Sequence, residues 1–240
     1  MKATRLRLLI LICALSVSLN GFSSHKIYLL HGFGGLKLQM EELDKALTKD
    51  SYITENYTYQ SISEDLDTIG KELYLKVKSE HYDTVSFVTH SMGGLVVRAM
   101  YKYIAHANDF PKVYRIVMIA PPNGGTEVAD FFAKRPNIAK LSPNISHMTT
   151  DSTSLANQLP KPNCEVGIIA GIRGRKPWFN PFLKNDNDGT ISKNRTRLGV
   201  ETDYTEVIDT HDIITLNPKV VRLTTNFIRV GHFVAGDRRK

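Results

Sequence analysis

The chain has 240 residues, a formal net charge of +7 and 42% hydrophobic residues. This length suits one domain with a substantial core, and the composition excludes disordered and fibrous proteins. The cysteines, Cys13 and Cys164, exclude a CxxC pair and a zinc site built from cysteine clusters.

The first 23 residues have the order of a secretory signal peptide. Three basic residues precede the apolar stretch 8–19, which gives way to small polar residues at 21–24. This stretch is shorter than the roughly 20 apolar residues of a membrane span, so we expect cleavage near Ser23 rather than an uncleaved anchor. The mature chain, 24–240, is then exported to the periplasm or the exterior. Losing three positive charges lowers its net charge from +7 to +4, and Cys164 remains without a partner for a disulfide.

Three short basic clusters lie at 173–176, 193–197 and 238–240. They carry no interleaved aromatic pattern and no nucleic-acid motif. We therefore expect a solvated surface and no nucleic-acid partner. Attraction to anionic lipid headgroups, with transient contact with a membrane or lipid surface, is the competing interpretation.

Strands alternate with helices from residue 26 onward. The expected strands are 26–30, 55–60, 84–88, 114–119, 165–170 and 204–208. The expected helices are 39–47, a helix opened by Ser63 with an apolar face through Val77, a helix through 95–103, and 218–230 begun by Asn217. This alternation predicts a single α/β domain with a mostly parallel central sheet and helices on both faces.

The stretch 135–162 breaks this alternation, because it is rich in Pro, Asn, Ser and Thr. We expect an excursion over the sheet that forms a small lid above the site, with ordinary packing as the alternative for its apolar residues. Those residues are Ile138, Leu141, Ile145, Met148, Leu155 and Leu159.

Four unusual stretches follow expected strands. They are HGFGG at 31–35, THSMGG at 89–94, APPNGGTEVAD at 120–130 and DTHD at 209–212. In an open parallel sheet, ligands bind beyond the carboxyl ends of the strands. Four such stretches at one edge indicate a functional site rather than four unrelated glycine turns.

Ser91 lies at a junction between an expected strand and an expected helix. A strand that runs straight into a helix can hold one side chain out at the sheet edge, as in a nucleophile elbow. The elbow needs small residues two places on either side of the serine; Gly93 meets this condition and Thr89 does not. The alternative is that the serine merely begins the helix.

A serine hydroxyl becomes a nucleophile when a base removes its proton, and the usual base is a histidine oriented by a carboxylate. His211 follows the last strand and precedes the last helix, so we expect it to be the base, with His232 as the runner-up. His90 adjoins the serine, and its side chain should point elsewhere. His31 is expected to brace its own loop by hydrogen bonds. The remaining histidines are expected to have surface roles: His25, His81, His106 and His147.

The candidate carboxylates lie in the stretch NDNDGTIS. Asp-Gly is a common turn pair, which is the structural interpretation of this stretch. The chain order Ser, Asp, His favours Asp188 as the acid, with Asp186 in reserve. Asp209 and Asp212 are too close in sequence to His211 to orient it from the far side of its ring.

Attack on an ester carbonyl creates a negative oxygen that positioned N–H groups must stabilise. The N–H of Met92, at the start of a helix, is one candidate. The other is the N–H of Phe33, in a turn whose glycines, beginning with Gly32, allow the backbone to approach a substrate.

Together, HGFGG, HSMGG, APPNGG-x-x-x-AD, NDG and a late His followed by Asn-Pro resemble the lipase and esterase branch of the α/β-hydrolase superfamily. The resemblance covers nearly the whole expected mature chain and implies the α/β-hydrolase fold. By motif, it makes Ser91 the nucleophile, Asp188 the acid and His211 the base, and Phe33 part of the oxyanion hole. The chain departs from the family at Thr89, which puts the elbow geometry in question.

A second departure lies at 122–125, where the family usually has Pro-His-x-Gly. This departure alters the residues that line the pocket.

These patterns predict a serine hydrolase that cleaves acyl or lipid esters through an acyl-enzyme, without a metal or organic cofactor. An acyltransferase or a thioesterase would use the same groups. A non-catalytic binding protein is the alternative from another class, and the filled catalytic positions argue against it.

Overall fold

The computed structural model describes residues 24–172, 183 and 186–233. The expected signal peptide, 1–23, and the basic clusters 173–176 and 238–240 lie outside the described residues. Within the described ranges, six parallel strands form one sheet in the order β2-β1-β3-β4-β5-β6. The strands are β1 (His25–Leu30), β2 (Ile53–Tyr57), β3 (Thr84–His90), β4 (Lys112–Ile119), β5 (Glu165–Gly171) and β6 (Asp203–Val207).

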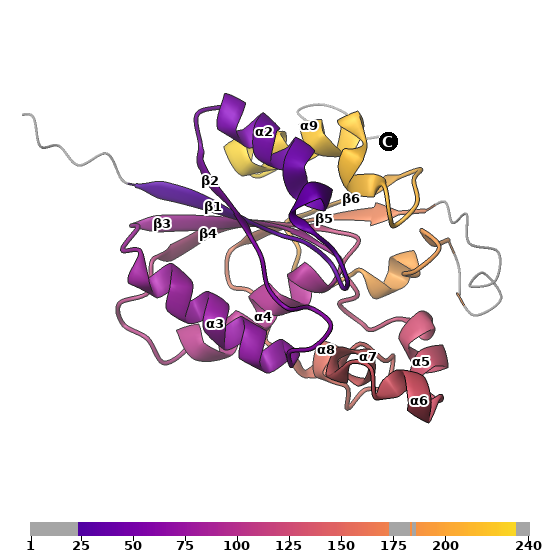
Figure 1. Cartoon of the computed structure of the whole chain (residues 1–240). Helices are drawn as coiled ribbons and strands as arrows, with labels where there is room; N and C mark the ends of the chain where they lie inside the picture. The colour runs from indigo at the N-terminus through magenta and orange to yellow at the C-terminus, as the bar shows by residue number, and fades with distance from the viewer. Residues whose placement is uncertain (1–23, 173–182, 184–185, 234–240) are drawn as a thin grey trace, which may run out of the picture.

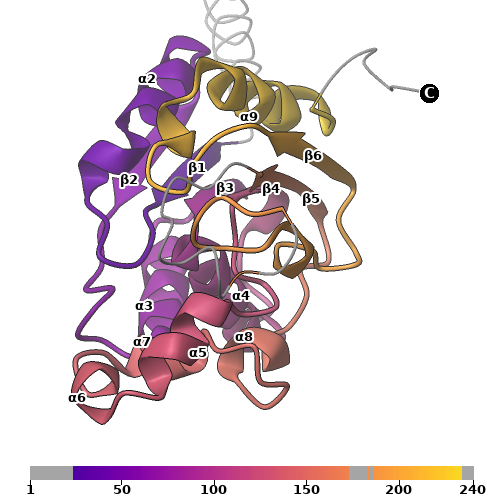
Figure 2. The ribbon, with the colours of Figure 1, turned by 90° about the vertical axis from the view of Figure 1, so that its right-hand side faces the viewer.

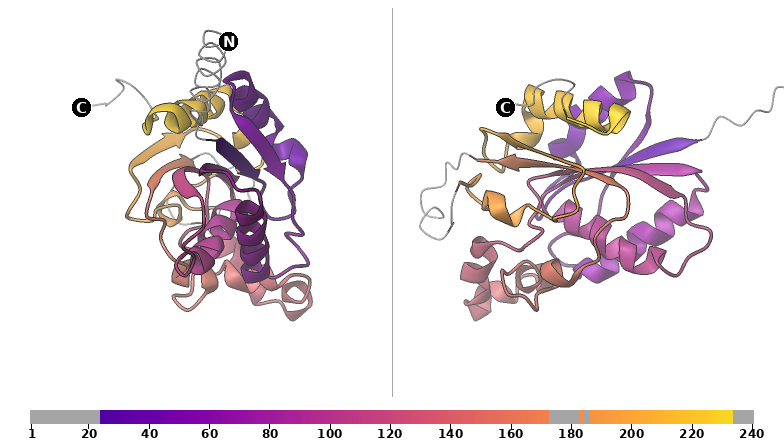
Figure 3. Two further views of the ribbon diagram at one scale, coloured as in Figure 1. Left: turned by 90° about the vertical axis from the view of Figure 1, so that its left-hand side faces the viewer. Right: turned by 180° about the vertical axis from the view of Figure 1, so that it is seen from behind.

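Helices cover both faces of the sheet, which confirms the predicted fold class. On one face lie α2 (Glu41–Lys49) and α9 (Pro218–Val230), and on the other lie α3 (Leu66–Ser79) and α4 (Met92–Ile104) (Figure 1). The two panels of Figure 3 show the same two layers from the other sides. Three short 3₁₀ helices are η1 (Lys37–Met40), η2 (Lys193–Arg195) and η3 (Ile214–Leu216). No helix in the described part of the chain is both long and apolar enough to cross a membrane.

The excursion expected at 135–162 contains three short helices that were not predicted. These are α6 (Pro136–Ala139), α7 (Pro143–His147) and α8 (Leu155–Gln158), preceded by α5 (Glu127–Ala133). Proline stands in the first turn of both α6 and α7, where its missing N–H costs no hydrogen bond. Figure 2, which looks onto the carboxyl ends of the strands, shows α5 to α8 gathered on the side of α3 and α4.

The strand order places a crevice at the end of β1 and β3. From β1 the chain crosses through α2 to β2, and then returns through α3 to β3 on the other side of β1. Because such crossovers are right-handed, the reversal of direction puts α2 and α3 on opposite faces. The two crossovers therefore diverge between β1 and β3, and this switch point is where an open parallel sheet binds its ligand.

Side chains of the central strands alternate between two apolar cores. Tyr28 and Phe87 pack toward α3 and α4, whereas Ile27, Leu29 and Val88 pack toward α2 and α9. All five are fully buried. Because helices cover both faces, these strands read as continuous apolar runs, as is typical of parallel sheets.

Most element boundaries differ from the predictions by one or two residues, and the largest shifts are in α3 and β2. Helix α3 begins at Leu66 rather than Ser63, because the side chain of Asp65 accepts a hydrogen bond from the N–H of Asp67 and caps the helix there. Strand β2 begins at Ile53 and ends at Tyr57, because it pairs along β1 over this length only. The start of α9 is as predicted, with the Asn217 side chain as its cap.

A buried cation lies near the amino end of β1, at the opposite end of the strand from the crevice. Lys26 of β1 is 7% exposed, and its Nζ lies 2.6 Å from Glu55 Oε2 and 2.5 Å from Glu80 Oε2. Lys76 and the hydroxyl of Tyr28 also donate to Glu80. Burial would raise the pKa of Glu80, but the hydrogen bonds from Lys26, Lys76 and Tyr28 outweigh it and lower the pKa to about 2.

Glu80→Gln should reduce stability in a pH-dependent way. The folded state lowers the pKa of Glu80 from 4.5 to about 2, so its contribution is complete above about pH 4.5 and is lost as the pH falls toward 2. We expect the difference in free energy of unfolding between wild type and variant, measured with urea, to shrink over this window. Glu72→Gln, at an exposed position of α3, the helix that Glu80 follows, is the control. A difference that stays constant from pH 7 to pH 2 would contradict this assignment.

Candidate active site

Ser91 turns the chain sharply between β3 and α4. Its φ is 51° and its ψ is −124°, a conformation that residues other than glycine rarely adopt. The backbone N–H of Ser91 donates to the carbonyl of Ile119 at 2.9 Å, which fixes the turn against β4. The side chain makes no capping hydrogen bond to α4, so it is free to face the crevice.

The residues on either side of Ser91 fit this turn. A Cβ at Gly93 would lie 2.7 Å from the carbonyl oxygen of Leu30 and 2.8 Å from that of His31, so the start of α4 touches the end of β1. Thr89 is fully buried, and its hydroxyl donates to the carbonyl of Val117 at 3.3 Å. The threonine in place of the family glycine is therefore accommodated by β4, and the elbow forms.

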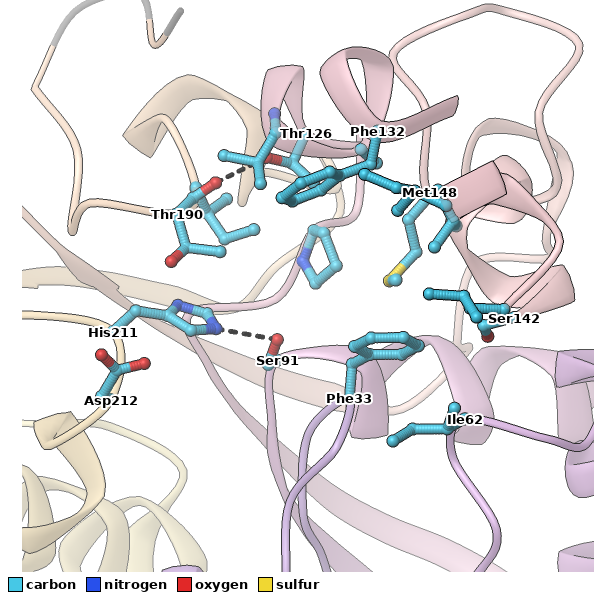
Figure 4. Close-up of a pocket in the computed structure, with 17 residues that line it drawn as sticks. Phe33, Ile62, Ser91, Thr126, Phe132, Ser142, Met148, Thr190, His211 and Asp212 are labelled. Atoms are coloured by element: carbon cyan, nitrogen blue, oxygen red, sulfur yellow. Dashed lines mark hydrogen bonds between the residues drawn. The ribbon is translucent and has the colours of Figure 1, made fainter. Parts of the chain in front are cut away.

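Three predicted side chains meet at the end of the sheet. His211 Nε2 lies 2.9 Å from Ser91 Oγ (Figure 4), and His211 Nδ1 lies 2.6 Å from Asp188 Oδ2. Because a carboxylate only accepts, Nδ1 carries the proton and Nε2 is left to accept from the serine hydroxyl. The three residues are between 1% and 7% exposed, so their hydrogen bonds are shielded from bulk water.

The carboxylate of Asp188 is held by more than the histidine. Its Oδ1 accepts hydrogen bonds from the N–H groups of Thr190 at 2.9 Å and Ile191 at 2.7 Å. The carbonyl of Asp188 also accepts from the backbone N–H of His211 at 2.9 Å. Asp188 therefore fixes both the ring and the main chain of His211.

The reserve candidates lie elsewhere. Asp186 pairs with Lys193 at 3.0 Å. The ring of His232 is 62% exposed, with its Nδ1 4.0 Å from Asp203. Asp209 accepts from the side chain of Asn217 at 2.7 Å, and Asp212 lies on the cavity wall beside the site.

The predicted oxyanion donors lie on both sides of the serine. Phe33 follows β1, and Met92 is the first residue of α4, where unpaired N–H groups and the helix dipole favour negative charge. Within the described residues, neither backbone N–H donates a hydrogen bond to the protein. A Cβ at Gly32 would lie 2.9 Å from the Cβ of Ser91, so the β1 turn can approach the serine only with glycine there.

The loop histidine His31 braces this turn, as its predicted role requires. Its Nδ1–H donates to the carbonyl of Gly32 at 2.8 Å, and its ring stacks on Tyr59 at a centroid distance of 4.3 Å. The hydroxyl of Tyr59 donates back to the carbonyl of His31. Burial lowers the pKa of His31, although the Gly32 carbonyl opposes that shift.

The expected surface role is wrong for His25. It is the first residue of β1 rather than a residue before the strand, and its Nε2 lies 2.9 Å from the hydroxyl of Ser86. Its ring also contacts Tyr52 and Tyr114 edge-on. Because β1 pairs with β3 from His25 onward, His25 is part of the sheet.

An apolar cavity of about 460 Å³ lies beside Ser91. Its lining residues are Phe33, Ile62, Ser91, Pro122, Thr126, Val128, Ala129, Phe132, Ile138, Leu141, Ser142, Ile145, Met148, Thr190, Ile191, His211 and Asp212. Figure 4 shows Phe132 and Met148 across the cavity from Ser91 and Phe33. Four of the six apolar residues of the excursion line the cavity. One of these, Met148, also belongs to the buried core, and Leu155 and Leu159 pack there as well.

Of the first two residues of the departure at 122–125, one lines the cavity and the other makes hydrogen bonds behind the cavity wall. Pro122 lines the cavity. Asn123 is buried away from it and donates to the carbonyl of Thr196 at 2.8 Å. In the described part of the chain, no group of three or more His, Cys, Asp or Glu side chains could hold a metal ion.

Sequence analysis did not single out Arg98 of α4. This side chain is 2% exposed and donates to the carbonyls of Ala156 at 2.9 Å, Leu159 at 2.6 Å and Pro160 at 3.1 Å. It also donates to the carbonyl and side-chain oxygens of Asn123. Burial lowers the pKa of Arg98 to about 10. The sequence signal that could have identified Arg98 is its position as a lone cation inside the apolar run LVVRAM.

Asn144 was missed in the same way. It is fully buried in α7 and donates to the carbonyls of Ser61 at 2.9 Å and Glu64 at 2.7 Å. Its side-chain oxygen accepts from the N–H of Leu66 at 2.9 Å, at the start of α3. The excursion is therefore tied to α4 through Arg98 and to α3 through Asn144.

The basic cluster at 193–197 is paired with acidic side chains. The ion pairs are Lys193–Asp186 at 3.0 Å, Arg195–Glu127 at 3.7 Å and Arg197–Glu201 at 2.8 Å. These pairs offset much of the positive charge of the cluster.

A family model described as "Domain of unknown function (DUF7379)" matches residues 22–167. The chain belongs to this family. No curated protein matches this DUF7379 member.

Solved structures with the same fold as this DUF7379 member include lipases and esterases. The mature Bacillus licheniformis lipase BlEst2 has a TM-score of 0.69 at 19% identity, over 88% of this chain and 94% of that one. The metagenomic carboxyl esterase MGS0156 has a TM-score of 0.59 at 16% identity, over 80% and 65%. The Staphylococcus hyicus lipase has a TM-score of 0.57 at 14% identity, over 88% and 95%. These likenesses show the α/β-hydrolase fold of lipases and esterases, as the resemblance implied.

Proposed function

We propose that this protein is a serine hydrolase that cleaves carboxylic esters of acyl chains. The observation that carries the proposal is the unbroken hydrogen-bonded path from Ser91 through His211 to Asp188, beside an apolar cavity. Nucleophile, base and acid in this contact form the arrangement that activates a serine hydroxyl.

The reaction begins with attack of Ser91 Oγ on the ester carbonyl carbon. His211 Nε2 accepts the hydroxyl proton as the new C–O bond forms, and the carbonyl oxygen becomes an oxyanion. The N–H groups of Phe33 and Met92 stabilise that oxyanion, and removing one such donor typically costs about 3–4 kcal/mol of barrier. The C–O bond to the alcohol then breaks, and the imidazolium gives its proton to the leaving alcohol.

The resulting acyl-enzyme is released by water. His211 takes a proton from the water as its oxygen attacks the acyl carbon, and then returns that proton to Ser91 Oγ as the carboxylic acid leaves. Asp188 keeps its charge throughout, because it orients the ring and stabilises the imidazolium rather than accepting its proton.

The cavity favours an acyl chain as the group that binds beside Ser91. Its walls are mostly apolar, and burial of an acyl chain contributes about 0.8 kcal/mol for each CH₂ group. The excursion at 135–162 acts in this proposal as the cover of that acyl site. Acyl transfer to an alcohol and thioester hydrolysis remain the alternatives on the same groups, and tests with alcohol acceptors and thioesters separate them.

Ser91→Ala should abolish ester hydrolysis and labelling by a fluorophosphonate probe, and Asp188→Asn should lower kcat by about 10⁴-fold. Asp186→Asn is the matched control. Asp186 lies two residues before Asp188 in the sequence, but its side chain pairs with Lys193 instead of His211. Steady-state kinetics on p-nitrophenyl esters measures all three variants. Equal loss in both aspartate variants, or undiminished labelling of Ser91→Ala, would rule out the proposed roles.

Leu141→Ser should weaken catalysis on long acyl chains selectively. Leu141 lines the cavity although it is 68% exposed, so its side chain is available to contact the distal carbons of a long chain. We expect kcat/KM for p-nitrophenyl octanoate to fall by about 3- to 10-fold and that for the acetate to be unchanged. Leu75→Ser, at an exposed leucine of α3, is the control. An equal fall for both esters would place the acyl chain elsewhere.

We also propose that residues 1–23 are a signal peptide and that the catalytic domain, 24–240, is exported. Expression of the full chain in a bacterial host should yield an exported protein whose mass corresponds to cleavage near Ser23. A chain lacking residues 2–23 is the control and should stay in the cytoplasm. Recovery of the uncut chain in the membrane fraction would instead indicate an anchor.

A further inference from the structure

His90, the last residue of β3, lies against the main chain of His211. Its Nε2 is 3.0 Å from the carbonyl oxygen of His211, and the two rings have a centroid distance of 4.7 Å. A carbonyl oxygen only accepts hydrogen bonds, so Nε2 of His90 carries a proton and donates it. The His90 side chain is therefore bound to the main chain of the residue whose ring faces Ser91.

The other ring nitrogen of His90 has no hydrogen-bond partner in the described part of the chain. The residue is 1% exposed, and Nδ1 finds no hydrogen-bond acceptor or donor among the described residues. Buried polar atoms are rarely left in this state, and each exception calls for an explanation. Burial, followed by the nearby charge of His211, lowers the pKa of His90 well below its usual value, so the ring stays neutral beside the imidazolium that forms during catalysis.

The main chain of His211 is held by two hydrogen bonds, and His90 donates one of them. The backbone N–H of His211 donates to the carbonyl of Asp188 at 2.9 Å, and its carbonyl accepts from His90 at 3.0 Å. His211 lies in a turn between β6 and η3 rather than in a regular element. These two bonds therefore set where the histidine backbone stands relative to the sheet.

This arrangement links the base to the nucleophile through consecutive residues. The strand end that presents Ser91 Oγ to His211 Nε2 at 2.9 Å also presents His90 to the carbonyl of the same histidine. Any shift of the histidine turn away from β3 would lengthen both contacts together. Misplacement by about 1 Å can lower a rate by about 10²-fold.

We propose that His90 is a positioning residue whose Nε2–H···O=C hydrogen bond holds the main chain of His211 in the place from which its ring meets Ser91. This inference rests on the proposed function, because it assigns the role of His90 within that reaction. A role in packing alone is the rival explanation, since a ring of this size also fills the space beneath the turn.

A matched pair of variants separates these roles. His90→Gln keeps a side-chain N–H that reaches about as far as Nε2, whereas His90→Met has a similar length and shape but no donor. We expect His90→Met to lower kcat by about 10- to 100-fold with KM within about 2-fold of wild type. The rate of fluorophosphonate labelling should fall in parallel. His90→Gln should stay within about 5-fold of wild type, and the two variants should share one melting temperature within a few degrees.

Crystal structures of both variants provide a readout that does not depend on activity. The contact between Ser91 Oγ and His211 Nε2 should be lost in His90→Met and kept in His90→Gln. Wild-type kcat in both variants, equal losses in both, or an unmoved His211 in His90→Met would overturn the positioning role. If the wild-type protein itself neither hydrolyses esters nor reacts with the probe, the proposed function fails, and the two crystal structures still decide whether His90 positions His211.

Discussion

The turn at Ser91 is the constraint on which the rest of the site depends. Because β3 ends at His90 and α4 begins at Met92, a single residue must reverse the course of the chain, and it does so at φ 51°. A helix that starts this close to the sheet must touch β1, which only a residue without a side chain allows at Gly93. The same geometry leaves the N–H of Met92 unpaired beside the serine hydroxyl. One strained residue thus presents the proposed nucleophile and brings the proposed donor to it.

His211, the proposed base, is held by main-chain contacts rather than by regular structure. His211 lies in a turn. Its N–H donates to the carbonyl of Asp188 in a preceding loop, and its carbonyl accepts from His90 at the end of β3. The carboxylate of Asp188 is in turn fixed by two backbone N–H groups. The site is therefore assembled from strand ends and short turns that meet at one edge of the sheet, and the sheet itself supplies the rigidity.

Much of this arrangement follows from local sequence signals. The cap at Asn217, the apolar strands and the Ser, Asp, His order predict the last helix, the parallel sheet and the residues that meet at its edge. The start of α3 was misplaced because both Ser63 and Asp65 are suitable caps, and only the contact of the Asp65 side chain with the N–H of Asp67 decides between them. Local propensity alone cannot make that choice.

The contacts of Arg98, Asn144 and His90 could not be predicted from the sequence. Most of their partners are main-chain groups far away along the chain, and a carbonyl oxygen carries no side-chain signature. For the same reason, the sequence left open whether the apolar residues of the excursion cover the site or pack into the core. The tertiary structure shows that four of them line the cavity beside Ser91, that the other two pack into the core, and that Met148 does both.

The tethers of the excursion have a mechanical consequence. Arg98, buried among carbonyl oxygens, ties α8 to α4, the helix that follows Ser91, and the buried Asn144 ties α7 to the start of α3. Helix α6 buries none of its residues and has no such fastening. Any movement of the excursion would therefore begin at this one short helix and the turns that flank it, where no buried residue holds the chain in place.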